Sequence, residues 1–183
     1  MTMKKPRLEA LYHEQLRSEL QKKLGLKNIM EVPRLEKIVV NVGVKDAVAD
    51  TKFLQVVSGV LKTVTGQLPI RTNAKKSIAG FKIRAGMPLG VKVTLRRRRM
   101  YEFLDRLINL ALPKVRDFQG VPTKLDRQGN YNLGIKEWVI FPEVDYEVSD
   151  KIYGMNITFH TSSCNDDSAR ELLKGFGMPF RKA

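Results

Sequence analysis

The stretch FKIRAGMPLGVKVTLRRRRMYEFLDRLINLAL, residues 81–112, decides the fold class. In its first half, apolar and polar side chains alternate over residues 81–84 and 91–95, which is the two-residue period of a half-buried strand. The segment between them, AGMPLG, contains two glycines and a proline. We therefore predict a hairpin with a long mobile tip.

The second half of this stretch has helical periodicity. Its apolar residues recur at the three- and four-residue spacing of one helix face, and they are Met100, Phe103, Leu104, Leu107, Ile108 and Ala111. This spacing predicts a helix over residues 97–112 that ends at Pro113, because proline cannot continue a helix.

The flanking sequence adds further elements of both kinds. Apolar residues spaced by four predict a helix over residues 7–24, ended by Gly25, and a second helix begins at Asp50 as its N-cap and ends at Gly66. A last helix is expected over residues 165–174, with Asn165 or Asp166 as its cap. Branched and aromatic residues predict strands over residues 36–42, 131–138 and 153–160.

The elements together favour one α+β domain over residues 1–183, in which helices pack on one face of a mainly antiparallel sheet. An N-terminal helix occupies residues 1–25, and the body, residues 26–183, carries a mobile loop at about residues 75–90. The uncovered face of the sheet is then available to a ligand.

Charge identifies the class of ligand. The chain has a net charge of +14, and residues 71–99 contain ten basic residues and no acidic one. Surfaces exposed only to water usually mix both signs, so this segment predicts neutralisation by a polyanion. Nucleic acid is the first candidate and an anionic membrane surface the main rival.

The four arginines at residues 96–99 enter a helix and so point in different directions. We expect two of them to bind RNA and the others to be solvated or paired with a carboxylate such as Glu102. Their charges lie at the positive end of the helix dipole, an unfavourable position that nearby phosphates would relieve.

The segment LKTVTGQLPIRTNAKKS, residues 61–77, resembles the signature of the ribosomal protein L-five family. SIAGFKIRAGMPLGVKVTLR (77–96), MYEFLDRL (100–107) and GMNITFHTS (154–162) are similar to the same family. The resemblance implies a small α+β protein of the large ribosomal subunit without catalytic activity. It also implies binding of 5S rRNA, attachment of that RNA to the large rRNA, and contact with peptidyl-site tRNA. A basic small-subunit head protein and other ribosomal proteins are the implied protein partners.

Polar residues within apolar strands are the first candidates for RNA contact. Asn41 and Thr94 each need either a buried partner or a ligand, and the two alternatives are about equally weighted from the residues alone. The resemblance favours rRNA contact for Asn41, Gln67 and Thr94. Phosphate or sugar ligands are expected at Arg71, Thr72, Lys75, Lys92 and Arg96.

The loop at residues 75–90 resembles the family's loop that reaches tRNA. The tRNA contacts expected in it are Lys76, Ser77, Gly80, Lys82, Arg84 and Met87. Glu143, Asp145 and Glu147 belong to an acidic segment that is either an ordinary solvated loop or a docking patch for a basic protein.

Enzyme chemistry is poorly supported. His160 and Cys164 are close in sequence, but no third group is evident to orient a nucleophile, and one cysteine with two distant histidines cannot form a metal cluster. We expect no cofactor, no metal, no small-molecule substrate and no membrane span, and a cytoplasmic, ribosomal location. The alternative is a free-standing RNA chaperone or regulator that uses the same basic surface.

Overall fold

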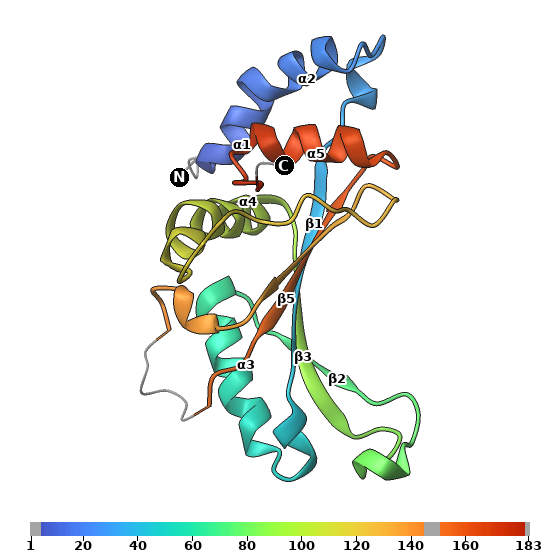
Figure 1. The fold of residues 1–183 in the computed structure, drawn as a ribbon, viewed down its shortest axis with the longest axis vertical. Coiled ribbons are helices and arrows are strands. Elements are labelled where there is room, and N and C mark those ends of the chain that lie inside the picture. Colours follow the sequence, from blue (N-terminus) through green and yellow to red (C-terminus); the bar gives the residue numbers. More distant parts are fainter. Residues whose placement is uncertain (1–4, 145–150, 182–183) are drawn as a thin grey trace. The chain divides into compact units, whose positions relative to one another are not determined.

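Five strands form one antiparallel sheet in the order β2-β3-β1-β5-β4 (Figure 1). The computed structural model describes residues 5–144 and 151–181. The strands are β1 (Leu35–Gly43), β2 (Ile70–Asn73), β3 (Pro88–Leu95), β4 (Tyr131–Ile135) and β5 (Met155–Thr161). The predicted α+β class with a mainly antiparallel sheet is confirmed.

The helices follow the predicted periodicity. α1 (Arg7–Leu11) continues through a π-helical turn into α2 (Arg17–Lys23), and α4 (Arg97–Arg106) continues into a second π-helical turn. The remaining helices are α3 (Lys52–Thr65) and α5 (Asp166–Gly175). Gly25 and Gly66 adopt the left-handed conformation expected of helix terminators.

Two helix ends differ in detail from the sequence prediction. The α3 helix begins two residues after Asp50, with Thr51 as its N-cap, although the Asp50 carboxylate accepts a hydrogen bond from the Lys52 amide at 2.8 Å. Pro113 lies inside a short 3-10 turn that follows α4 and its π-helical turn. A proline is tolerated in the first turn of a helix because the amide that it lacks would have no hydrogen-bond partner there. Asn165 caps α5 as predicted, accepting from the Asp167 amide at 3.2 Å.

The chain forms two compact units. Unit 1 contains Met1–Ile38, Arg96–Leu133 and Thr158–Ala183, and unit 2 contains Val39–Leu95 and Gly134–Ile157. Strands β1, β4 and β5 contribute residues to both units. In unit 2, α3 packs against β3, and the buried side chains include Leu54, Val57, Leu61, Val91, Val93 and Leu95.

The predicted partner of the β3 strand is wrong. Residues 81–84 do not form a strand, and β3 pairs instead with β2 in antiparallel register. The alternation in FKIR is too short to determine pairing, and Lys82 adopts a left-handed conformation with φ of 56° that interrupts an extended chain. The hairpin therefore lies between β2 and β3, and its connection spans residues 74–87.

An ion pair within unit 2 holds Asp46. The carboxylate accepts hydrogen bonds from Lys151 Nζ and from the Tyr153 hydroxyl, each at 2.9 Å. The Lys151 ammonium also lies 4.8 Å from the centroid of the Phe53 ring. The hydrogen bond from Lys151, followed by the one from Tyr153, lowers the pKa of Asp46 below its ordinary value of 3.8.

We expect Asp46→Asn to make stability less sensitive to acid. A carboxyl group whose pKa is lower in the folded state stabilises the fold above its unfolded pKa, and this contribution disappears as the pH falls through the folded pKa. The wild-type urea midpoint should therefore fall more steeply than that of the variant as the pH drops below about 3.8. Identical pH profiles for the two proteins would contradict a stabilising role for this pair.

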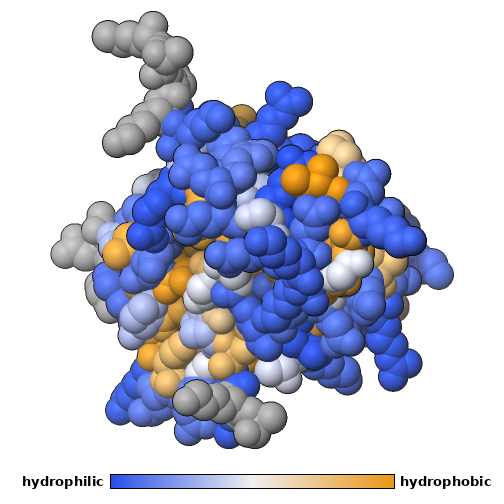
Figure 2. Space-filling view, turned by 90° about the horizontal axis from the view of Figure 1, so that it is seen from above, coloured by the Kyte–Doolittle hydropathy of each residue, from blue (hydrophilic) through white to orange (hydrophobic). Residues whose placement is uncertain are grey.

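The face seen in Figure 2 is mainly hydrophilic and carries separate hydrophobic patches. Eight large hydrophobic residues are exposed among those described, and four of them fall between residues 68 and 81. No described helix is long and apolar enough to cross a bilayer. Half of the exposed large hydrophobic residues therefore lie just before or within the carboxylate-free segment, residues 71–99.

Candidate nucleic-acid interface

One face of the unit 2 strands carries a set of accessible polar side chains. Ile70 pairs with Lys92 and Thr72 pairs with Gly90, so the side chains of β2 and β3 at these positions share a face. Lys92 and Thr94 alternate with buried valines and so lie on the side of β3 opposite to α3. We call the face formed by Asn41, Thr72, Gly90, Lys92 and Thr94 the open face.

The side chains of Asn41 and Thr94 have no hydrogen-bond partner among residues 5–144 and 151–181. Asn41 is half-buried between the buried Val40 and Val42, and its amide makes no hydrogen bond to any residue that the structure describes. The Thr94 hydroxyl likewise has no partner in this part of the chain. Within the described residues, both polar side chains are therefore accessible for an external partner.

Gln67 is positioned beside the open face. Its amide Nε2 donates to the Thr94 carbonyl oxygen at 3.1 Å, which ties the end of α3 to β3. The adjacent Thr65 hydroxyl donates to the Leu61 carbonyl oxygen at 2.6 Å and stabilises the helix end. The side chain of Gln67 is thus held next to Thr94 before any ligand arrives.

Gly90 keeps the open face flat. A Cβ atom at this position would lie 2.8 Å from Thr72 Oγ1 and 2.9 Å from the Val42 carbonyl oxygen, so a side chain does not fit without displacement. A surface without a projecting side chain at its centre allows a sugar-phosphate backbone to approach the sheet closely.

Three predicted rRNA ligands do not join this set. Arg71 pairs with the buried Val91, so its side chain lies on the opposite face of the β2–β3 ribbon from Lys92. Arg96 belongs to unit 1, where it is the exposed N-cap residue of α4. Lys75 is exposed just beyond β2, at the start of the hairpin connection.

Backbone hydrogen bonds bridge the hairpin connection at its tip and at its base. Ile78 and Ile83 exchange two hydrogen bonds of 2.9 and 3.1 Å around a short 3-10 turn, Ala79–Phe81. At its base, the Ala74 amide donates to the Met87 carbonyl oxygen at 2.8 Å, and the Gly86 amide donates to the Ala74 carbonyl oxygen at 2.9 Å. The connection is therefore braced by hydrogen bonds of its own backbone, and its predicted mobility stays a prediction.

The predicted tRNA contacts in the hairpin fall into two groups. Lys76, Lys82 and Arg84 are exposed cations, and Gly80 is exposed in the turn. Ser77 and Met87 instead support the loop, because Ser77 Oγ accepts from the Ala85 amide at 2.9 Å and Met87 Sδ accepts from the Arg84 amide at 3.2 Å.

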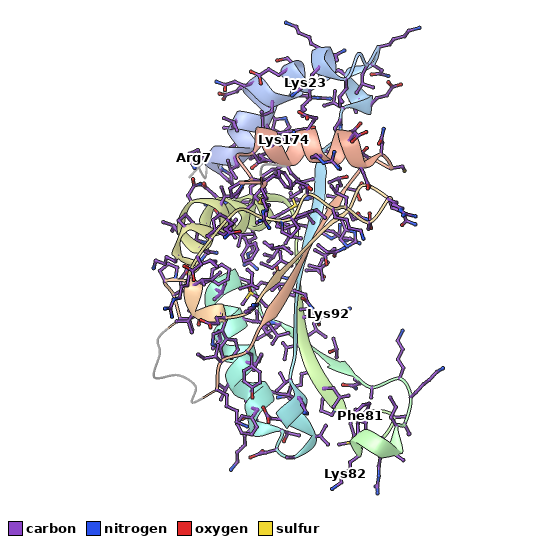
Figure 3. The ribbon with its side chains drawn as sticks, viewed as in Figure 1. Arg7, Lys23, Phe81, Lys82, Lys92 and Lys174 are labelled. Atoms are coloured by element: carbon purple, nitrogen blue, oxygen red, sulfur yellow. The ribbon has the colours of Figure 1, made fainter. Side chains whose placement is uncertain are left out.

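Phe81 is a candidate contact residue that the sequence prediction missed. Figure 3 shows it beside Lys82 at the end of the hairpin. Phe81 is 69% exposed, and Ile78 in the same connection is 47% exposed. The sequence could have indicated this contact, because Phe81 follows a glycine in a basic segment without carboxylates. A loop of this kind has no apolar core in which to bury a phenylalanine ring.

The arginines at residues 96–99 are partly neutralised within unit 1. Arg98 Nε donates to Glu102 Oε1 at 2.7 Å, which confirms the predicted pairing with Glu102 for one of the four. Arg97 adopts a left-handed conformation with φ of 51° at the start of α4. A non-glycine residue in this conformation is strained, a feature that often accompanies functional sites.

The remaining candidates are His160, Cys164 and the acidic segment. His160 Nδ1 contacts Asn130 Oδ1 at 3.1 Å, and Cys164 is exposed and free. Within residues 5–144 and 151–181, no group of three His, Cys, Asp or Glu side chains could hold a metal ion. Glu143 is half-buried, whereas Asp145 and Glu147 lie outside the described residues.

Comparison with known proteins gives consistent matches. Residues 28–84 match the family described as Ribosomal protein L5, and residues 88–180 match the model of the C-terminus of the same ribosomal family. The chain is 58% identical over 176 residues to a large ribosomal subunit protein uL5 from Magnetococcus marinus, covering 96% of this chain and 95% of that protein. A protein of the same name from Moorella thermoacetica is 56% identical over 177 residues, covering 96% of this chain and 98% of the relative.

Proposed function

Because the chain belongs to the ribosomal protein L5 family, and is thus a structural, non-enzymatic constituent of the large ribosomal subunit, we propose that its open face binds 5S rRNA. In this proposal, the protein holds 5S rRNA against the large rRNA in the central protuberance. The hairpin contacts peptidyl-site tRNA, and the segment around Glu143 faces a basic small-subunit protein across an intersubunit bridge.

The chemistry of the open face is the observation that supports RNA binding. It combines one ammonium group, Lys92, with the amide of Asn41 and the hydroxyls of Thr72 and Thr94 around a glycine that permits close approach. Cations bind phosphates without regard to sequence, whereas amides and hydroxyls select ribose and base edges. The described aromatic side chains lie elsewhere, so this face suits a folded RNA groove and not a splayed single strand.

The hairpin supplies a second type of contact. Its exposed cations provide electrostatic attraction, and Phe81 provides an apolar surface that can pack on a ribose or a base. Since the loop is braced internally, little ordering entropy is lost when it meets RNA. A braced projection of this kind suits transient contact with a tRNA that must later leave.

Binding selectivity tests the proposal directly. Purified protein is titrated against 5S rRNA in a gel-shift assay at about 0.2 M salt, with tRNA and unlabelled 5S rRNA as competitors. We expect unlabelled 5S rRNA to compete at a concentration at least about tenfold lower than tRNA does. Equal competition by both RNAs would support a free-standing RNA chaperone or regulator instead.

Phe81→Ser is expected to weaken the tRNA contact alone. Stacking of an aromatic ring on RNA contributes about 1–3 kcal/mol, so we expect peptidyl-site tRNA to dissociate at least about fivefold faster from reconstituted ribosomes. The side chain is exposed, so the unfolding temperature and the affinity for 5S rRNA should not change.

Leu110→Ser is the matched control for this variant. Leu110 is an exposed large hydrophobic residue of unit 1, and its replacement removes a comparable apolar side chain that does not belong to the hairpin. An equal effect of both substitutions on tRNA dissociation would show that the hairpin tip does not contact tRNA.

A further inference from the structure

The outer edge of the sheet at β2 has no neighbouring strand among the residues that the structure describes. β2 is the first strand in the order β2-β3-β1-β5-β4, and in Figure 1 it lies on the outer side of β3. An edge strand presents backbone amides and carbonyls with which a further strand can pair. Both β2 and β3 belong to unit 2, so this edge is a feature of that unit alone.

The hydrogen bonds at the base of the hairpin show which residues of β2 face outward. The Ala74 amide donates to the Met87 carbonyl oxygen at 2.8 Å, and the Ala74 carbonyl oxygen accepts from the Gly86 amide at 2.9 Å. The backbone of Ala74 therefore faces the β3 side. Consecutive residues of a strand direct their backbone groups to opposite sides in the plane of the sheet. The amides and carbonyls of Asn73 and Arg71 thus face away from β3.

The β3 strand gives the same orientation independently. The Thr94 carbonyl oxygen accepts from Gln67 Nε2 at 3.1 Å, which indicates that the Thr94 backbone points to the side from which β2 begins. Two residues earlier, the backbone of Lys92 points the same way and forms a hydrogen-bonded pair with Ile70. Arg71, the next residue of β2, is then in a pair without hydrogen bonds, and its amide and carbonyl have no partner among the described residues.

The side chains along this edge combine apolar and cationic groups. Leu68 is 71% exposed and Ile70 is 67% exposed. Ile70 lies on the side of the open face, and the exposed Arg71 lies on the opposite side. Arg71 makes no ion pair within the described part of the chain, and residues 71–99 contain no carboxylate to compensate its charge. The edge therefore suits an apolar group on one side and an acidic group on the other.

The charges disfavour a second copy of this chain at the edge and favour an acidic partner. Pairing of two β2 edges would bring Arg71 and the exposed Lys75 and Lys76 close to identical cations, and like charges on paired strands are destabilising. Cations and prolines at edge strands prevent self-association in this way, and Pro69 directly precedes β2. An extended segment with carboxylates would instead neutralise the same cations.

We propose that the free edge of β2 is a docking site for an extended acidic segment of a partner protein, which adds to the sheet as a further strand. The amides and carbonyls of Arg71 and Asn73 bind its backbone. The side chain opposite Arg71 is a carboxylate, because directly opposed residues share a face, and the side chain beside Ile70 is apolar. These bonds lie in the plane of the sheet, so the segment does not occupy the open face, and the inference does not depend on binding of 5S rRNA.

Amide hydrogen exchange on the isotope-labelled, full-length protein tests the proposal. The probe is a heptapeptide with blocked ends in which valine and glutamate alternate. At about 1 mM peptide, we expect the amide hydrogens of Arg71 and Asn73 to exchange at least about tenfold more slowly than in the free protein. The Thr72 amide is the internal reference, because it already faces β3 and should exchange at an unchanged rate.

Two matched peptides separate strand addition from attraction of charge alone. N-methylation of the glutamates keeps their charge but removes the donors that face β2, because the residue opposite Arg71 forms a hydrogen-bonded pair with it. We expect neither this peptide nor a valine–lysine peptide to slow the exchange. Equal protection by the N-methylated peptide would overturn strand addition.

Charge reversal tests the contact with Arg71. Arg71→Glu should weaken binding of the valine–glutamate peptide about fivefold to tenfold and allow the valine–lysine peptide to bind, since opposite charges on paired strands attract. Lys52→Glu, at the exposed first residue of α3, is the matched control and should bind the valine–glutamate peptide as the wild type does. Thermal unfolding verifies the fold of each variant, and if Arg71→Glu does not fold, the N-methylated peptide decides with the wild-type protein.

Failure of this inference is distinct from failure of the proposed function, because the exchange experiment contains no RNA. Unchanged exchange at Arg71 and Asn73 with the valine–glutamate peptide overturns the inference and leaves β2 as an edge that its cations merely protect. Protection of these amides by 5S rRNA or tRNA, and not by the peptide, also overturns it and assigns the edge to RNA. Protection by the peptide, with the charge preference reversed in Arg71→Glu, supports docking of an acidic strand.

Discussion

Lys92→Glu is expected to weaken binding of 5S rRNA about 30-fold to 100-fold at ~0.15 M salt, a loss of about 2–3 kcal/mol. The substitution removes a cation from the centre of the open face and places a negative charge where a phosphate would lie. Lys92 is exposed on β3, so the unfolding free energy should change little. Gel-shift or filter-binding titration with 5S rRNA measures the effect.

Arg71→Glu is the control for the charge change. Arg71 lies on the neighbouring strand, only one register position from Lys92, but its side chain is on the opposite face. The same change of two charge units should therefore weaken binding less than about fivefold, because only longer-range, salt-screened repulsion remains. Similar losses for the two variants would show that the RNA responds to net charge and not to the open face.

The salt dependence gives a second measure of the same contact. Lys92→Ala should reduce the slope of log affinity against log salt by about one, since one phosphate contact and its released counterion are lost. Arg71→Ala should leave that slope unchanged. An unaltered slope for Lys92→Ala would mean that its ammonium does not touch a phosphate.

Gly129→Ala is expected to destabilise the protein by about 3 kcal/mol and to lower its unfolding temperature by roughly 6–12 °C. Gly129 has a φ of 74°, and a Cβ atom there would overlap the Ser163 carbonyl oxygen and lie 2.9 Å from the Ser163 carbonyl carbon. The turn cannot shift without loss, because the Gly129 amide donates to Asp166 Oδ1 at 2.9 Å and its carbonyl oxygen accepts from the Thr161 hydroxyl at 2.7 Å. Chemical denaturation measures the difference.

Gly25→Ala separates the two causes. Gly25 has a similar positive φ of 63°, but no atom lies within 4 Å of the Cβ position. The cost should then be about 1 kcal/mol, the strain of a left-handed residue alone. If both variants lost equal stability, the overlap with Ser163 would not contribute, and backbone strain would explain the whole effect.

The elements predicted from local pattern were mostly confirmed. The apolar spacing predicted one helix over residues 97–112 and another over residues 7–24, and the structure has α4 in the first range and α1 and α2 in the second, each with a π-helical turn. Such predictions succeed because a helix is stabilised within its own segment and by one buried stripe. Asn165 and Asp166 were predicted as alternative N-caps of α5 for the same reason, since a cap bonds an amide only two positions away, and the cap is Asn165.

The pairing of β3 was predicted incorrectly because it depends on a residue pair 22 positions apart, Ile70 and Lys92. Alternation over residues 81–84 resembled a strand in isolation, but the left-handed Lys82 and the bridge between Ile78 and Ile83 make it a loop. Hydrogen bonds between strands are not encoded by the local spacing of either strand.

The sequence by itself determined the family, the α+β class and the cationic, carboxylate-free segment, because a motif, a periodicity and a charge count are properties of neighbouring residues. Only the tertiary structure decided which of those cations share a surface. The β2–β3 register puts the side chains of Lys92 and Thr72 on one face of the sheet and that of Arg71 on the opposite face. Side chains far apart in the chain meet through strand pairing, and the direction of each is set by a register that no single segment contains.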